Sequence, residues 1–466
     1  MDGTQSLYRF HPRATKPAPE NAVPLPRDVR ASGCPEDGKR YFFRPGEILV
    51  RRRDLDDARF PGLAEGLRNE GAVPWEEWRA AGTSPELVYP EGLSEYQRDI
   101  FDAKRSALIA LAERGLEAAE VQRFVIPRLA DPDNIEQDDI PDVLDRLVTA
   151  GRDQRRSSRE AGDKEESLSA EEEWPVFPHI VMTGEDDDGV FGPAMAVRPL
   201  DEVPQLNVDE TLGEGIRIAV IDTGVREDHV WLDGRCETRP LVDQETLDTS
   251  PPFAQLDFEA GHGTFIAGVI RQFAPAAKLV MRGVMDSSGI IDDGVLAGAI
   301  RELEEALPLH ILNLSLGGYI HNHLLLAPDK VTELTVRDLR VQHVGLPATA
   351  GAIERLRRIN LEEHGVRLVI VAAAGNNGSG EPFYPAALPR VIGVGALNQD
   401  FSKSIWSNHG DWVDAWEIGA EVVSSFIGPD LGQPGGGGSG REGAIWSGTS
   451  FAAPRLVGLL AAAMTV

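Results

Sequence analysis

The chain has 466 residues, of which 42% are hydrophobic, and a formal net charge of −29. This length is enough for two or three domains with a substantial buried core. The acidic balance argues against a nucleic-acid partner, because binding to phosphates needs clustered Lys and Arg.

The start of the chain carries no recognisable export signal. Met1 to Pro19 contains basic residues but no apolar core of signal-peptide length, and no later stretch approaches a membrane span. The two cysteines, Cys34 and Cys236, lie far apart, which predicts no disulfide framework and agrees with a reducing compartment. We therefore expect a cytoplasmic protein with no membrane partner.

Residues 1–150 predict an N-terminal region that is mixed and largely helical. Its first 40 residues are rich in Pro and charge and predict loose order. A strand is expected over Glu47–Val50, at the end of Tyr41–Arg52, and the segment Asp54–Asn69 is expected to follow it as a helix. Apolar residues at helical spacing then predict a helical region over Ser94–Ile126 and a shorter helix over Asp139–Ala150.

Residues 151–173 are charged, contain serines and lack an apolar period, which predicts a linker. We place a second domain over residues 174–466, with its core from about residue 205. Two short strands are expected at its start, Phe177–Met182 and Ala194–Pro199, separated by an acidic turn.

From Ile216 onward, apolar strands alternate with helices, which is typical of an α/β fold with a parallel sheet and helices on both faces. The predicted strands are Ile216–Ile221, Lys278–Val284, His310–Leu316, Arg367–Ala373 and Val391–Val394. The predicted helices are His262–Phe273, Asp292–Ala306, Thr349–His364 and Ser450–Met464. In such sheets the functional residues gather at the carboxyl ends of the strands and at the helix starts that follow.

The octapeptide from Ser447 to Pro454, S-G-T-S-F-A-A-P, places Ser450 at a tight turn that opens into a helix. A serine becomes a nucleophile when it has exposure, a base and donors for the oxyanion that it creates. The helix start offers unpaired backbone N–H groups and a positive dipole end. The alternative is an ordinary serine N-cap.

Two further motifs supply candidates for the base and its orienting carboxylate. Asp222 directly follows a buried strand, where it could also form a simple strand-end turn, and His262 opens a helix between two glycines. Together with Ser450 they predict acyl transfer: the serine attacks a carbonyl, the histidine moves its proton, and the aspartate orients the imidazole. We assign the oxyanion donor to Asn376, rather than Asn377, because it directly follows the A-A-A-G run.

These motifs resemble those of the subtilisin-like serine peptidases, whose triad follows the order Asp, His, Ser. The resemblance covers roughly Ile216 to Thr465 and includes the run N-L-S-L-G-G from Asn313. It implies that Ser315, Leu316 and Gly317 form a strand that pairs with the substrate backbone. It also implies that Ala373, Ala374 and Gly375 line the pocket for the residue before the scissile bond.

The chain departs from the family pattern at several places. Tyr319 to Pro347 reads as an insertion that either narrows the cleft, recruits a partner or forms a plain surface excursion, and Pro429 to Gly440 is a long glycine-rich approach to the nucleophile. Phe451 stands where the family usually has methionine, so oxidation at that position is not expected. Family members usually continue beyond the nucleophile helix, so a chain ending at Val466 either closes its fold differently or is shortened.

Calcium is frequent in the family, but the acidic clusters Asp186–Asp188 and Asp292–Asp293 lack ligand spacing and predict solvated turns and a helix start. We therefore predict no metal site and no required cofactor, and structural calcium stays open. The N-terminal region has two alternative readings: a prodomain-like element that assists folding or inhibits, and a partner-sensing or scaffold element.

The sequence thus predicts a serine endopeptidase acting on protein or peptide substrates. We expect it to be gated, as a zymogen, by its N-terminal region or by an activating or inhibitory protein partner. The alternative from another class is a catalytically silent pseudo-protease that acts as a binding or scaffold protein.

Overall fold

The computed structural model describes residues 30–32, 41–57, 60–81, 95–130, 140–160, 176–183, 197–200, 209–226, 228–232, 234–245, 259, 261–285, 289–319, 346–427 and 442–465. The predicted acidic turn at Asp186–Asp188, the glycine-rich segment from Pro429 and almost all of the predicted insertion lie outside these residues. None of the helices described is both long and apolar enough to cross a membrane.

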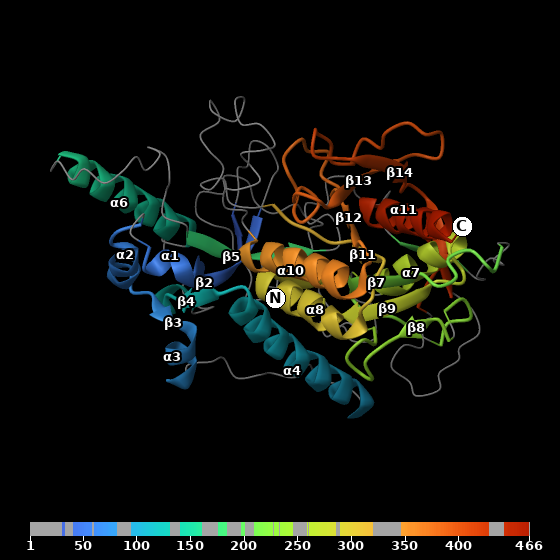
Figure 1. The fold of residues 1–466 in the computed structure, drawn as a ribbon, viewed down its shortest axis with the longest axis horizontal. Helices are drawn as coiled ribbons and strands as arrows, with labels where there is room; N and C mark the ends of the chain where they lie inside the picture. Colours follow the sequence, from blue (N-terminus) through green and yellow to red (C-terminus); the bar gives the residue numbers. More distant parts are fainter. Residues whose placement is uncertain are drawn as a thin grey trace, which may run out of the picture.

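The second half of the chain is organised by a parallel sheet (Figure 1), which has seven strands in the part of the chain described. Its order is β14-β13-β12-β11-β7-β9-β8, and each neighbouring pair is parallel. The strands are β7 (Arg217–Asp222), β8 (Cys236–Glu237), β9 (Lys278–Gly283), β11 (Ile311–Leu314), β12 (Val369–Ala373), β13 (Ile392–Leu397) and β14 (Ala415–Ile418). The five predicted strands are confirmed as β7, β9, β11, β12 and β13; the short edge strands β8 and β14 were not predicted.

Helices cover both faces of this sheet because its strands are apolar on both sides. Ala219 and Ile221 of β7 belong to one buried cluster with α8 and α10, whereas Ile218 and Val220 belong to a second cluster with α7 and α11. The helices are α7 (His262–Phe273), α8 (Asp293–Glu302) with a following 3-10 turn (Leu303–Ala306), α10 (Pro347–His364) and α11 (Thr449–Met464). All four predicted helices are therefore confirmed.

The N-terminal region forms an antiparallel sheet with helices around it (Figure 1), and two strands from later in the chain, β5 and β10, complete this N-terminal sheet. Its order is β10-β5-β2-β4-β3, with β1 on a branch paired to β2. The strands are β1 (Arg30–Ser32), β2 (Tyr41–Arg51), β3 (Val73–Pro74), β4 (Val121–Val125), β5 (Val176–Thr183) and β10 (Ile290–Asp292). The helices are α1 (Arg52–Leu55), α2 (Leu63–Asn69), α3 (Trp75–Ala80), α4 (Glu95–Ala118), α5 (Pro127–Ala130) and α6 (Ile140–Glu160).

Three sequence predictions for this region were wrong in extent or type. The helix predicted over Ser94–Ile126 ends at Ala118, and Val121–Val125 is strand β4. This segment contains β-branched and aromatic residues, which favour strands, and it pairs with β2 and β3. The strand pairing decides its structure, although the spacing of its apolar residues also fits a helix. The helix predicted over Asp139–Ala150 continues to Glu160 through the first part of the predicted linker, where Arg, Gln and Glu favour helix without an apolar period.

The segment Asp54–Asn69, predicted as one helix, forms the separate short helices α1 and α2. The strand predicted over Phe177–Met182 exists as β5, but it pairs with β2 and β10 and so lies in the N-terminal sheet. The strand predicted over Ala194–Pro199 appears as β6 (Arg198–Leu200), which joins β15 (Val422–Ser425) and β16 (Gly443–Trp446) in a small third sheet. The division of the chain into domains stays a prediction.

Candidate active site

The predicted site residues gather at one edge of the parallel sheet. Asp222 is the last residue of β7, Ser315 follows β11 and Asn376 follows β12 by three residues. Because β7, β11 and β12 are adjacent and parallel, their carboxyl ends lie side by side. The first turns of α7 and α11 add His262 and Ser450 to the same place.

Asp222 and His262 form a buried hydrogen-bonded pair. Nδ1 of His262 lies 2.8 Å from Oδ1 of Asp222, and both side chains are fully buried. The same oxygen accepts from the backbone N–H of Thr223 at 2.8 Å and lies 3.3 Å from the Thr223 hydroxyl oxygen. The carboxylate is thereby fixed, and it in turn fixes the orientation of the imidazole.

Ser450 lies in the first turn of α11, where Gly448 precedes the helix. Its hydroxyl donates to the carbonyl oxygen of Ser315 at 3.2 Å, and the Ser315 hydroxyl donates to the carbonyl oxygen of Ser450 at 2.8 Å. Asn313 supports this pair by donating to the Ser315 hydroxyl at 3.0 Å. The end of β11 therefore holds the serine turn directly.

The side chain of Asn376 is oriented by the residue before Ser450. Its Oδ1 accepts from the backbone N–H and from the hydroxyl of Thr449, both at 2.9 Å. The Thr449 hydroxyl also accepts from the backbone N–H of Gly375 at 3.0 Å. Since Oδ1 is occupied by two donors, Nδ2 is the end of the amide that can donate to a group beside Ser450.

Aromatic rings enclose the imidazole on the side of α11. The ring of His262 meets Trp446 edge to face, with centroids 5.6 Å apart, and lies 5.4 Å from the tilted ring of Phe451. Phe265 completes the cluster at 4.5 Å from Phe451. The phenylalanine that replaces the family's usual methionine is thus part of the wall against His262, a role that the sequence alone did not indicate.

The two segments predicted to bind substrate both lie against the ring of Phe383. A methyl group added to Gly317 would lie 2.1 Å from Cε1 of Phe383, and one added to Gly375 would lie 3.1 Å from the same ring. Phe383 is 8% exposed and packs edge to face against Tyr319. Leu316, Ala373 and Ala374 are buried in the same part of the sheet. Phe383 therefore fills the space between these segments.

A second carboxylate, Glu245, lies behind the Asp222–His262 pair and was missed by the sequence reasoning, because no motif surrounds it. Its Oε2 accepts from the Thr223 hydroxyl at 3.0 Å and from the backbone N–H of Gly261 at 3.2 Å. Its Oε1 accepts from the backbone N–H and hydroxyl of Thr264 at 3.1 Å and 3.0 Å. Burial raises the pKa of the Glu245 carboxyl, and the positive charge of Lys104 opposes that rise.

The acidic pair Asp292–Asp293 is buried and has structural partners at a helix start, as predicted. Asp292 caps α8 by accepting from the backbone N–H of Val295, as the predicted helix start requires. Asp293 accepts from the backbone N–H groups of Ala348 and Thr349 at the start of α10. Among the residues that the structure describes, no group of three His, Cys, Asp or Glu side chains is arranged to hold a metal ion.

Sequence comparison identifies the family to which this fold belongs. The sequence model of the subtilase family matches residues 213–466, more than half of the chain. The chain belongs to the subtilase family.

Two characterised relatives show how distant the similarity is. The chain is 29% identical over 270 residues to the thermophilic serine proteinase of Bacillus sp. (strain AK1), covering 54% of this chain and 53% of that protein. It is 29% identical over 269 residues to the intracellular serine protease of Paenibacillus polymyxa, covering 54% of this chain and 68% of that protein. The chain thus spans about half the length of the thermophilic relative.

Among solved structures, that of a cold adapted subtilisin-like serine proteinase aligns with a TM-score of 0.38 and 25% sequence identity. The alignment covers 57% of this chain and 84% of that one.

Proposed function

We propose that the protein is a serine endopeptidase that hydrolyses peptide bonds through an acyl-enzyme. The observation that carries the proposal is the buried hydrogen bond of 2.8 Å between His262 and Asp222, next to the helix turn that bears Ser450. In this proposal His262 takes the proton of Ser450 as its oxygen attacks the carbonyl carbon, and later gives it to the leaving amine. Asp222 holds the imidazole and stabilises its cation.

The oxyanion formed by the attack would receive hydrogen bonds from Nδ2 of Asn376 and from the backbone N–H of Ser450. The Thr449 contacts favour this role, because they turn the amide of Asn376 so that its donor end is available. Ser315 to Gly317 would pair with the backbone of an extended substrate, and Ala373 to Gly375 would line the adjacent pocket. We propose no cofactor for this chemistry.

Labelling of the full chain with a fluorophosphonate probe, beside Ser450→Ala, tests this function. We expect the wild-type protein to gain the mass of one probe and the variant to gain none. No labelling of the wild-type protein would leave a gated zymogen or the pseudo-protease alternative, a binding or scaffold protein. Labelling restored by truncation of the N-terminal region would then favour the zymogen.

The position of Phe383 favours substrates with a small side chain before the scissile bond. In peptide anilides that differ only at that residue, we expect alanine to be cleaved faster than leucine. Phe383→Ala should raise the kcat/KM ratio of leucine to alanine substrates by about 10- to 100-fold, because the ring no longer fills the pocket.

A ratio of two substrates measured on one protein sample is independent of the folded fraction, so a loss of stability does not affect it. Phe401→Ala is the matched control, because Phe401 is 71% exposed. An unchanged ratio in Phe383→Ala would show that the ring lies outside the substrate pocket.

We further propose that the protein acts in the cytoplasm and that its N-terminal region or a protein partner gates the site. The extensive packing of α4 on α8 supports an influence of the N-terminal region on residues 213–466, here called the peptidase half. A gate is needed if a peptidase shares a compartment with its host's own proteins.

A further inference from the structure

Helix α4 of the N-terminal region packs on the peptidase half with direct contact between backbones. A Cβ added to Gly115 would lie 2.1 Å from the carbonyl oxygen of Gly294, and one added to Gly298 would lie 2.0 Å from that of Leu111. Such distances leave no room for a side chain at Gly115 or Gly298 between α4 and α8. Leu111, Ala112 and Leu116 belong to the same buried cluster as the residues of α8. Helix α4 therefore contributes side chains to the same hydrophobic core as α8.

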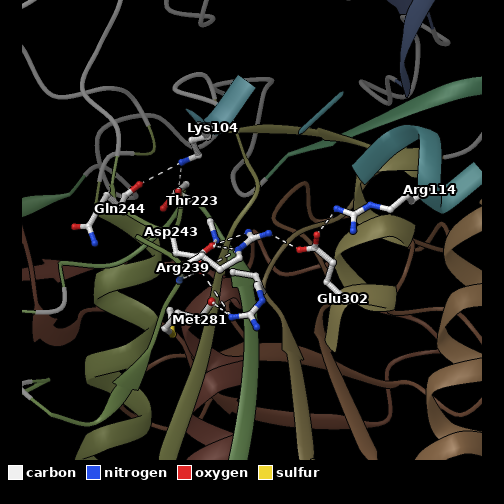
Figure 2. A network of polar contacts seen from close by, with 10 residues as sticks. Lys104, Arg114, Thr223, Arg239, Asp243, Gln244, Met281 and Glu302 are labelled. Atoms are coloured by element: carbon white, nitrogen blue, oxygen red, sulfur yellow. Dashed lines mark hydrogen bonds and ion pairs between the residues drawn. The ribbon is translucent and has the colours of Figure 1, made fainter. Parts of the chain in front are cut away.

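The same face of α4 carries a buried lysine toward the active site. Lys104 precedes Gly115 by eleven residues, about three helical turns, so the Lys104 side chain leaves the helix on the face on which Gly115 lies. Lys104 is 3% exposed. Its Nζ donates to the carbonyl oxygen of Thr223 and lies 3.4 Å from that of Gln244 (Figure 2). Thr223 is the residue after Asp222.

Glu245 connects this lysine to the two segments that carry the candidate triad. Its carboxylate accepts hydrogen bonds from Thr223, next to the end of β7, and from Gly261 and Thr264 at the start of α7. The charged groups that act on it are Lys104, which favours its ionised form, and Asp222, which opposes it. A carboxylate buried this deeply needs a compensating cation, and Lys104 is a cation brought to it from outside the peptidase half.

A second polar path from α4 fixes the segment that bears Glu245. Arg114 of α4 pairs with Glu302 of α8, Glu302 pairs with Arg239, and Arg239 pairs with Asp243 at 2.7 Å (Figure 2). Asp243 also accepts from the backbone N–H of Gly283 at 2.8 Å. The segment 239–245 is therefore held from α4 at two points, through Arg114 at one end and Lys104 at the other.

We propose that Lys104 is a positioning residue for the Asp222–His262 pair, supplied by the N-terminal region. It neutralises Glu245 and holds the carbonyl groups that flank the Asp222 loop, so that the peptidase site is complete only while α4 is docked. This makes α4 a required part of the active protein, so that gating by the N-terminal region would act through the docking of α4 and not through its removal. The inference rests on the proposed peptidase function.

The test uses the full chain in four forms: wild type, Lys104→Met, Lys104→Arg and the control Arg105→Met. Arg105 neighbours Lys104 on α4 and is exposed. The rate of fluorophosphonate labelling at Ser450 is measured from the acidic to the alkaline range, together with the midpoint of thermal unfolding. We expect Lys104→Met to lower the labelling rate by up to about 100-fold, Lys104→Arg to recover part of the loss, and Arg105→Met to match the wild type.

The pH profile separates positioning from a general loss of structure. Without Lys104, the pKa of Glu245 rises further, because burial and Asp222 raise it and only the backbone hydrogen bonds from Thr264 and Gly261 still lower it. At low pH the carboxyl is protonated and needs no cation; as pH rises through its raised pKa, an unbalanced charge appears beside Asp222. The ratio of the Lys104→Met rate to the wild-type rate should therefore fall with rising pH. A structural role alone would lower that ratio equally at every pH.

The outcomes separate this inference from the function on which it rests. If the wild-type protein is not labelled and removal of the N-terminal region does not restore labelling, the peptidase proposal is contradicted and the inference falls with it. Labelling that appears only after that removal overturns the inference alone. If the wild type is labelled and Lys104→Met reacts at the same rate at every pH, or at a rate lowered by one constant factor, only the inference is overturned.

If Lys104→Met does not fold, the double variant Lys104→Met with Glu245→Gln, which removes both charges, replaces it. A folded double variant that labels more slowly than Glu245→Gln alone supports the inference, because the further change is the loss of the Lys104 contact with Thr223. Equal rates in these two variants overturn it.

Discussion

Replacing Asp222 with asparagine is expected to lower the rate of acylation of Ser450 by about 10⁴-fold while leaving the fold intact. Asparagine has the shape of aspartate, so the contacts with Thr223 can be kept. It carries no charge, however, and the imidazolium that forms as His262 takes the serine proton loses its stabilising partner. The loss should appear in the labelling rate and in kcat for a peptide anilide, with little change in KM.

Asp228→Asn is the matched control for this variant. Asp228 is exposed, lies six residues further along the chain and pairs with Arg226 at the surface. We expect its labelling rate to equal that of the wild type. A loss of less than ten-fold in Asp222→Asn would mean that the carboxylate does not support the histidine during proton transfer.

Replacing Asn376 with alanine should lower kcat by about 10²- to 10³-fold. The reason is geometric: Thr449 holds the amide by its oxygen, so its nitrogen is already placed for an oxyanion beside Ser450. A donor that is placed before the reaction needs no reorganisation when negative charge develops on the substrate. KM should change little, because the interaction is made chiefly in the transition state.

The neighbouring variant Asn377→Ala provides the comparison. In the wild-type protein the Asn377 side chain accepts from the Tyr319 hydroxyl at 3.1 Å, instead of making the Thr449 contacts. We expect Asn377→Ala to retain most of the wild-type kcat. If the two variants lose activity equally, the choice of Asn376 over Asn377 is wrong.

The peptidase half could be predicted closely from sequence because its signals are local. Runs such as Ile218–Ile221 are apolar without interruption, as strands buried on both faces must be. The bounds predicted for helix α7 match the structure at both ends. Gly261 has a φ of +85°, which stops the helix from extending backward, and Pro275 follows its end. The order of strands then brought Asp222, Ser315 and Asn376 to one edge without further information.

The parts that could not be predicted depend on contacts between distant segments. The spacing of Val121, Phe124 and Val125 fits a helix as well as a strand, and only pairing with β2 and β3 decides between them. Lys104 lies 119 residues before its acceptor Thr223, in a helix whose sequence looks ordinary. Glu245 reads as one acid among many in a chain with a net charge of −29.

The pairing of β5 with β10 has a consequence for the order in which the protein can assemble during synthesis. β5 ends at Thr183, but its neighbour β10 spans Ile290–Asp292, more than a hundred residues later. Until that stretch has left the ribosome, one edge of the N-terminal sheet has no strand beside it, and open edges invite pairing with other chains. The two halves of the chain therefore mature together, and the nascent protein depends on its second half to close the sheet of its first.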